Sequence, residues 1–409
     1  MSNSATSLRG PALLIVLACI LAGALAACSE DPTEANAIVS PVSLKDYTFR
    51  DTVIYADTTL SFRHYMPMNG TNNLVGRYGG YQAFTIIQFT PAYLPERDTA
   101  QVYAATLRLK AVSWFGNSAG TVAFDVYRVM QPWNPSTFAW DSLQSGFYEQ
   151  NIVRGTYSGI VGADSEWISV SLDTAMVREW LATNTSTTTT KYGIILVPTP
   201  GSTVVRGFYE YTADTSLAPS LQIIAGSPTG AARDTNAYII CSDTFVGNID
   251  GLVSNPSLLY IQSGVVYRST IHFNLSSIPR AAIINSAEML LDQDPTNSSL
   301  NRFSGDLAVV AHQLLSSSDT TQYTYTQYQT GTVKTGTTGT FAFNLRREAQ
   351  AWLKESNFGV VLGATSYLDQ YSARDREQSS FDLYAFFNQR AVDPSHRPRL
   401  KIIYAVTKG

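Results

Sequence analysis

The histidines are the residues best suited to acid–base chemistry and to metal binding. The chain of 409 residues has four of them, His64, His272, His312 and His396. None stands in the HExxH or HxH spacing that would bring two imidazoles to one metal ion. His272 lies in the apolar run STIHF, where a hydrogen-bonded structural histidine is the favoured interpretation. The histidines therefore indicate neither a metal site nor a catalytic base.

Other catalytic signatures are also missing from the sequence. It contains no GxSxG nucleophile elbow, phosphate-binding glycine loop or dinucleotide fingerprint. Acidic residues could still form a glycosidase acid–base pair, because such residues meet in space rather than in sequence. The two candidate groups are Glu149, Asp164 and Glu166 near Trp167, and Asp369, Asp375 and Glu377. We interpret both groups as solvated loop charges and predict that the protein is not an enzyme. A hydrolase or lyase of envelope polysaccharide is the minor alternative.

Metal binding has equally little support. Asp occurs in several expected loops, so structural calcium is conceivable, but no DxDxDG spacing identifies ligands. We therefore predict no cofactor and name no metal-binding residue.

Two tryptophans in the stretch RVMQPWNPSTFAWDSL could bind sugars, because aromatic faces stack on sugar rings. Trp133 and Trp140 stand seven residues apart among Pro, Ser, Thr and Asn. The same rings could instead pack beneath a long loop, since large aromatic side chains contribute strongly to core burial. We favour packing and keep a ligand-binding role for both tryptophans as the alternative. Trp114 and Tyr148 are further candidates for sugar stacking.

The amino-terminal segment predicts the location of the protein. Residues 11–27 form an apolar run of signal-peptide length. The run ends within the sequence LAAC, whose last residue is Cys28. This ending resembles the bacterial lipobox, which implies cleavage after residue 27 and acylation of the Cys28 thiol. Lipidation would anchor the protein to a membrane without spanning it. We expect a lipoprotein of the bacterial cell envelope, at the outer membrane, with periplasmic and surface exposure both open. An ordinary signal peptide ending near a cysteine is the alternative.

Cysteine and charge content narrow the class of protein further. With Cys19 in the leader and Cys28 acylated, Cys241 has no partner for an intrachain disulfide. Its apolar surroundings, AYIICSDTF, predict a buried small side chain rather than a catalytic thiol. Lys and Arg total 28 against 32 Asp and Glu, a formal net charge of −4, which argues against nucleic acid as a partner.

The chain repeats itself. FTIIQFTPAYLP (84–95) matches STIHFNLSSIP (269–279), and a later segment in each half aligns Trp180 with Trp352. Further matches in the same order are AATLRLK (104–110) with SAEMLLD (286–292), KYGIILVPT (191–199) with NFGVVLGAT (357–365), and LAPSLQIIA (217–225) with HRPRLKIIY (396–404). The matched order indicates two copies of one domain.

The sequence pattern of each copy predicts short strands separated by turn residues, which is typical of a β-sandwich. One short helix interrupts each copy, with Asp173 as a candidate N-cap in the first. The apolar helix faces are Met176, Val177, Trp180 and Leu181, and Ala349, Trp352 and Leu353. The expected segments are a lipoprotein leader (1–27), a polar tether (28–43), the first sandwich (44–226), a linker (227–235) and the second sandwich (236–409).

These segments together resemble a known family. The succession IIQFTPAYLP, ATLRL, VYRVMQPWNPSTFAW, SVSLDTAMVREWLATN and PSLQII is similar to the DNRLRE family, which overlaps carbohydrate-binding module family 96. The second copy lacks the loop tryptophans and offers Tyr323 and Tyr325 instead. The resemblance implies an all-β fold of two tandem jelly-roll-like antiparallel sandwiches. It also implies a non-catalytic surface module, often attached to polysaccharide-active or adhesive proteins.

Two functions remain open at this point. The protein could bind polysaccharide through its aromatic side chains, or it could be a structural or adhesive scaffold that binds an envelope protein. Fold alone does not decide between them, because sandwiches host many functions.

Overall fold

The computed structural model describes most of the chain after residue 45. The described residues are 46–65, 67–68, 72–89, 101–162, 165–181, 192–211, 216–230, 233–249, 255–262, 264–265, 267–298, 307–320, 329–330, 332–334, 339–366 and 383–408. The predicted leader, the tether and Cys28 lie outside these residues. Within the described part, no helix is both long and apolar enough to cross a membrane.

The described part is nearly all β, as the sequence predicted, and its strands form two curled antiparallel sheets. The first sheet has the order β11-β10-β4-β9-β2-β3-β8-β5-β6, with β7 paired to β4. Its strands are β2 (Asn72–Tyr78), β3 (Tyr81–Phe89), β4 (Gln101–Gly116), β5 (Thr121–Arg128), β6 (Gly155–Ile160), β7 (Trp167–Ser171), β8 (Ile194–Pro198), β9 (Val204–Tyr209), β10 (Ser220–Gly226) and β11 (Asp234–Ile249). Strand β11 pairs with both β10 and β3, so the sheet curls back on itself.

The second sheet has the order β16-β15-β19-β13-β1-β21-β14-β18-β17, and β12 and β20 pair with each other beside β13. Its strands are β1 (Tyr47–Arg63), β12 (Leu258–Gln262), β13 (Tyr267–Phe273), β14 (Ile283–Asp292), β15 (Leu307–Gln313), β16 (Gln329–Thr330), β17 (Thr332–Lys334), β18 (Thr340–Asn344), β19 (Val360–Ser366), β20 (Leu383–Phe387) and β21 (Arg399–Thr407). At the described ends of the chain, the Lys408 N–H donates to the Asp46 carbonyl at 2.8 Å.

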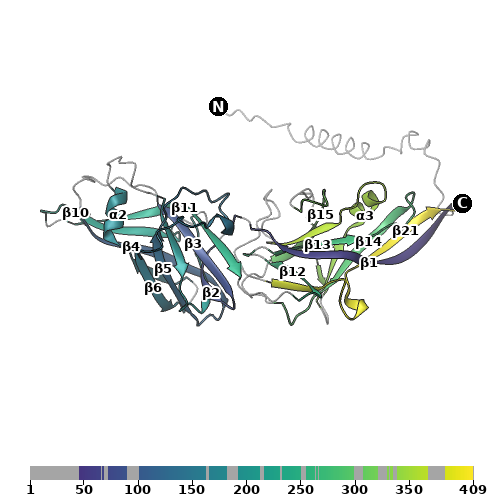
Figure 1. Ribbon diagram of the computed structural model, residues 1–409, viewed down its shortest axis with the longest axis horizontal. Helices are drawn as coiled ribbons and strands as arrows, with labels where there is room; N and C mark the ends of the chain where they lie inside the picture. Colours follow the sequence, from purple (N-terminus) through teal and green to yellow (C-terminus); the bar gives the residue numbers. More distant parts are fainter. Residues whose placement is uncertain are drawn as a thin grey trace, which may run out of the picture. The chain divides into compact units, whose positions relative to one another are not determined.

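Strands β1 and β11 are exchanged between the two copies. The expected boundaries assign β1 to the first copy and β11 to the second, but β1 lies between β13 and β21, and β11 pairs with β3 and β10. Figure 1 shows β1, in purple, running alongside strands of the second sheet. The pairing of these two strands therefore crosses the predicted boundaries, and the extent of each domain stays a prediction.

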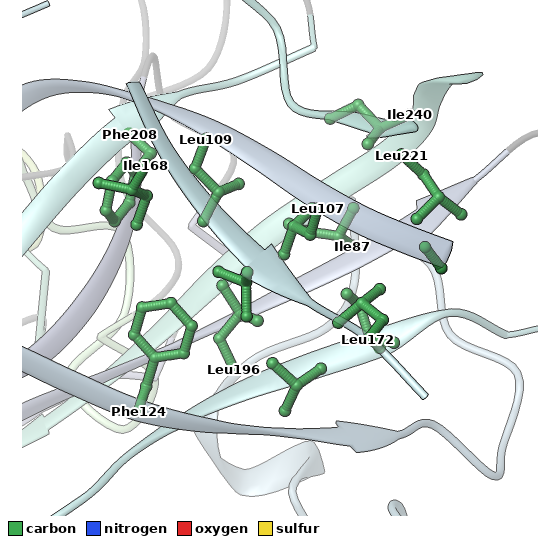
Figure 2. Packing of buried hydrophobic residues seen from close by; sticks show 14 of the residues in the cluster. Ile87, Leu107, Leu109, Phe124, Ile168, Leu172, Leu196, Phe208, Leu221 and Ile240 are labelled. Carbon is green, nitrogen blue, oxygen red and sulfur yellow. The ribbon is translucent and has the colours of Figure 1, made fainter. Parts of the chain in front are cut away.

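The core of the first sheet follows from the alternation of side chains along its strands. In β4, the side chains of Leu107 and Leu109 point inward and are almost completely buried. Figure 2 shows these two leucines packed with Phe124 of β5, Phe208 of β9 and Ile240 of β11. Ile240 comes from the exchanged strand, so β11 helps to fill the first core.

The two predicted helices are present. In α2 (Thr174–Leu181), the Asp173 side chain accepts a hydrogen bond from the Ala175 N–H at 2.9 Å, which confirms the predicted N-cap. Met176 and Val177 are fully buried, and Trp180 packs against the first core. In α3 (Arg346–Trp352), Ala349 and Trp352 are buried, as the repeat predicted. Each tryptophan thus holds a marginal helix against its sheet.

Candidate ligand-binding site

The structure places Trp133 and Trp140 against core residues. Both side chains are half-buried. The Trp133 indole N–H donates to the Tyr192 carbonyl at 2.8 Å, and its ring centre lies 6.2 Å from that of Phe138. The Trp140 ring meets Phe84 edge-on at 5.2 Å. These contacts agree with packing beneath the loop, and ligand binding at the two rings stays a prediction.

The other aromatic candidates also lie against the interior. Trp114 is half-buried, packs against the first core and has the Arg206 guanidinium 5.3 Å from its ring centre. Tyr148 is half-buried, with its ring centre 5.4 Å from that of Tyr127, and burial raises the pKa of the Tyr148 hydroxyl. Tyr323 and Tyr325 lie outside the described residues.

The interpretation of Glu149 as a solvated loop charge is wrong. Its carboxylate accepts hydrogen bonds from Arg154 Nε at 3.1 Å and from Arg154 Nη2 at 2.7 Å. Arg154 also contacts Asp173, and Arg128 pairs with Glu179 at 2.8 Å. The network joins strand β5, the segment before β6 and helix α2. Sequence alone misses it because its members are brought together only by the fold.

The remaining acidic candidates do not form a carboxylate pair in the part of the chain that is described. Glu166 is exposed, as predicted, and its side chain accepts a hydrogen bond from the Gly162 N–H at 2.9 Å. Asp164, Asp369, Asp375 and Glu377 lie outside the described residues. Among the described residues, no three His, Cys, Asp or Glu side chains gather as a metal site would require.

Cys241 lies on the exchanged strand β11, and His272 lies on β13 of the second sheet. The prediction of a buried Cys241 is wrong: the side chain is exposed, with its thiol 3.4 Å from the Gln88 carbonyl. Ile240 points into the core and the pairing register skips Cys241, so the thiol faces outward. The structural interpretation of His272 is confirmed, because its Nδ1 lies 2.7 Å from the Asp57 carboxylate.

A buried carboxyl lies elsewhere on the same strand. Asp243 is 7% exposed and accepts hydrogen bonds from the Asn73 side chain and, at 3.1 Å, from the Tyr211 N–H. Burial raises the pKa of Asp243 to about 7; the Asn73 hydrogen bond opposes this rise, and the Glu210 carboxylate adds to it. This group links stability to pH, and the sequence carried no signal for it.

The outer side of the first sheet brings together cationic and aromatic side chains. Leu107 and Leu109 point inward, so Arg108 and Lys110, which alternate with them on β4, point outward. Strand β7 pairs with this stretch and sets Trp167 opposite Lys110 and Ser169 opposite Arg108. We call Arg108, Lys110, Trp167 and Ser169 the cation–tryptophan face.

The geometry of this face is that of a cation–π cluster. Arg108 Cζ lies 4.6 Å from the centre of the Trp167 ring, and Lys110 Nζ lies 5.7 Å from it. Both distances are within the range of about 6 Å in which a cation is attracted to an aromatic ring. All three side chains are half-buried, and Ser169 is exposed. Among the described residues, neither cation forms an ion pair with a carboxylate.

The face can bind a flat anionic ligand. The indole ring offers apolar surface for stacking, and Arg108 and Lys110 keep N–H donors that are not used by an ion pair. A guanidinium beside an ammonium suits a carboxylate or sulfate group, since charge-assisted hydrogen bonds are stronger than neutral ones. In the sequence, Trp167 stands out only as a neighbour of the acidic residues Asp164 and Glu166. The register that places it beside the two cations could not be read from the sequence.

Comparison with known proteins adds no assignment, because no protein-family model and no curated protein matches the chain. The resemblance to the DNRLRE family therefore stays a prediction.

Proposed function

We propose that the protein is a lipid-anchored, non-catalytic cell-envelope protein whose first β-sandwich binds an anionic polysaccharide. The ligand lies on the cation–tryptophan face, with a sugar ring against the part of Trp167 that the two cations leave exposed and its acid group bound by Arg108 and Lys110. The observation that carries the proposal is the pair of cations beside an outward-facing indole with no carboxylate partner among the described residues.

The role of each side chain follows from its chemistry. The Trp167 ring supplies apolar contact and fixes the plane of the sugar. Arg108 supplies two parallel N–H donors for a carboxylate, whereas Lys110 supplies a point charge. Ser169 adds a hydroxyl at the edge of the face. The expected ligand is thus a polymer with a carboxylate or sulfate on most residues, and its binding weakens as salt rises.

The experiment is affinity electrophoresis of residues 44–409, which include every described residue, in gels containing polygalacturonate or a neutral glucan. The native protein should be retarded by the polyuronate only. Trp167→Ala and the double variant Arg108→Gln, Lys110→Gln should each abolish the retardation while thermal unfolding shows a folded protein. Lys401→Ala, which removes an exposed cation from the second sheet, is the matched control and should bind like the native protein.

Equal mobility of the native protein in all gels, across several acidic polymers, would refute the proposal. Loss of retardation in Lys401→Ala alone would place the site on the second sheet instead.

A protein-binding scaffold is the second candidate. Strand β1 exposes Val53 and Tyr55 on one side, each 47% exposed, and Ile403 of the neighbouring strand β21 is 43% exposed. Apolar side chains gathered on an outer sheet face are typical of contact surfaces between proteins. Tyr55→Ser should leave polysaccharide retardation unchanged, which separates the two candidates.

A further inference from the structure

The exchanged strands occupy equivalent places in the two sheets. Ile240 of β11 lies opposite Phe89, and Ala56 of β1 lies opposite Phe273. Phe89 and Phe273 are repeat-related in sequence, so β11 fills in the first sheet the place that β1 fills in the second. In both strands the register also skips the next residue. The two strands are therefore interchangeable in backbone geometry.

Their side chains are not interchangeable. Phe245 of β11 is fully buried opposite Thr85 in the first sheet. The matching residue of β1 is Ser61, which lies 2.8 Å from the Ser269 hydroxyl and accepts the Tyr260 N–H at 2.9 Å. Ser61 in place of Phe245 would leave a cavity, and Phe245 in place of Ser61 would remove these hydrogen bonds and clash.

Arg63, at the end of β1, also has a side chain that could not be exchanged with its counterpart in β11. Its Nε donates to the Tyr267 hydroxyl at 2.7 Å, and its guanidinium carbon lies 5.4 Å from the Tyr267 ring centre. The matching position in β11 is Gly247, which is buried. Arg63 in that position would bury a charge without a partner. Strand β1 thus fits the second sheet and is excluded from the first.

The contacts along the middle of β1 do not depend on which molecule supplies the strand. The side-chain hydrogen bonds of Asp57 and Ser61 go to Tyr260, Ser269 and His272, which all lie beyond residue 255 in sequence. At the end of β1, Arg63 also donates to Asn248 Oδ1 at 3.1 Å and to the Ile249 carbonyl at 2.8 Å in β11. Strand β1 is the first described strand, and residues 64–71 alone join it to β2. Without β1, strands β13 and β21 would each present an unpaired edge in the middle of the sheet, which is a strong template for another strand.

We propose that the place between β13 and β21 is a strand-acceptor site, and that its ligand is β1 of a second copy of this chain as well as the chain's own β1. Each molecule carries one donor strand and one acceptor site. Two molecules that exchange β1 reciprocally form a closed dimer, whereas one-way donation joins molecules head to tail. The proposal does not rest on polysaccharide binding.

The test uses two chains of residues 44–409 that each carry one cysteine. The donor is Ser61→Cys, Cys241→Ser, and the acceptor is Ser269→Cys, Cys241→Ser, with a different affinity tag. The two serines face each other across the strand pair, at a spacing that suits a disulfide. The chains are mixed in denaturant, refolded, oxidised and separated on a non-reducing gel. A control mixture pairs the donor with Ser276→Cys, Cys241→Ser, an exposed serine after β13.

A disulfide-linked heterodimer carrying both tags, absent from the control mixture, is the expected result. A single chain with both Ser61→Cys and Ser269→Cys should also form an intrachain disulfide. The proposal is overturned if that single chain is fully cross-linked while the mixture of donor and acceptor yields no heterodimer. It is equally overturned if the control mixture gives as much heterodimer as the test mixture.

Discussion

Repeat-related positions in the two sheets carry opposite chemistry. In the first sheet, Lys110 faces Trp167 across the β4–β7 pair, whereas in the second sheet Asp292 faces Thr340 across β14–β18. Asp292 is 5% exposed, accepts the Thr340 hydroxyl at 2.7 Å and pairs with Arg399 at 2.9 Å.

The difference teaches how one backbone serves two purposes. Among the described residues, Arg108 and Lys110 of the first sheet pair with no carboxylate and point outward, so their interaction energy is available to a ligand. In the second sheet, the carboxylate is already satisfied by its own chain. A buried, hydrogen-bonded ion pair adds specificity to the fold and offers little to a partner. We therefore expect the first sheet to bind the ligand, and the ion pair of the second sheet to stabilise the fold.

The largest effect should come from the exchanged strands. Phe245→Ser gives β11 the residue that β1 has at the same place, and it should lower the free energy of unfolding by about 3–5 kcal/mol because a filled core position is emptied. Chemical denaturation measures this loss. The reverse change, Ser61→Phe, should also destabilise the protein. A value of less than about 1 kcal/mol for Phe245→Ser would show that β11 does not hold the first core.

The pH dependence of stability should be the next largest effect. Burial raises the pKa of Asp243 to about 7, which means that the folded state favours the neutral carboxyl. Protonation of Asp243 therefore stabilises the folded protein. The contribution of this proton to stability is fully present below the pKa that Asp243 has in the unfolded chain, 3.8, and is lost as pH rises through 7. The free energy of unfolding should therefore fall by about 2–3 kcal/mol between pH 5 and pH 8. Asp243→Asn should flatten this slope, and the repeat-related Thr59→Asn should leave it intact.

Loss of the Asp292–Arg399 ion pair in the second sheet should have the third largest effect on stability. Asp292→Asn weakens the hydrogen bonds to Arg399 and Thr340 and should cost about 2 kcal/mol of unfolding free energy. The matched change in the first sheet, Lys110→Asn, should cost no more than about 0.5 kcal/mol, since Lys110 has no ion pair with a carboxylate in the part of the chain that the structure describes. Equal costs in denaturant titrations would remove the distinction between the two sheets.

The helix cap should give the smallest effect. Asp173 caps α2, whereas Leu345 at the start of α3 makes no side-chain cap. Burial alone would raise the pKa of Asp173, but hydrogen bonds from Arg154 and from the Ala175 N–H lower it below its ordinary value. Its contribution is thus present above the unfolded pKa and is lost as pH falls through the folded pKa. Asp173→Ala should cost about 1 kcal/mol at neutral pH, measured by thermal unfolding.

Local signals were enough to predict several of the strands and both helices. The alternation of Leu107 and Leu109 with polar residues marks a strand, and Asp173 before an apolar face marks a helix start. These patterns act within a few residues and need no knowledge of the rest of the chain. The internal repeat then indicated two copies of one sandwich.

The site and the exchange depend on pairings between distant segments. Which strand lies beside β4 decides whether Trp167 meets Arg108, and no local pattern specifies that register. The exchange of β1 and β11 depends on a few buried positions such as Phe245, which differ between otherwise similar strands. The misassigned Cys241 and Glu149 have the same origin, because a skipped register and an ion-pair network arise only in the folded chain.

The central claim is tested most directly by giving the first sheet the residues of the second. The variant Arg108→Leu, Lys110→Asp, Trp167→Thr carries the side chains of Leu290, Asp292 and Thr340 at the matching positions. Its affinity for polygalacturonate is measured by titration calorimetry at low salt, beside the native protein and Lys401→Ala. We predict that binding is lost in the triple variant while it remains folded, and that Lys401→Ala binds normally. Unchanged affinity in a folded triple variant would contradict the account.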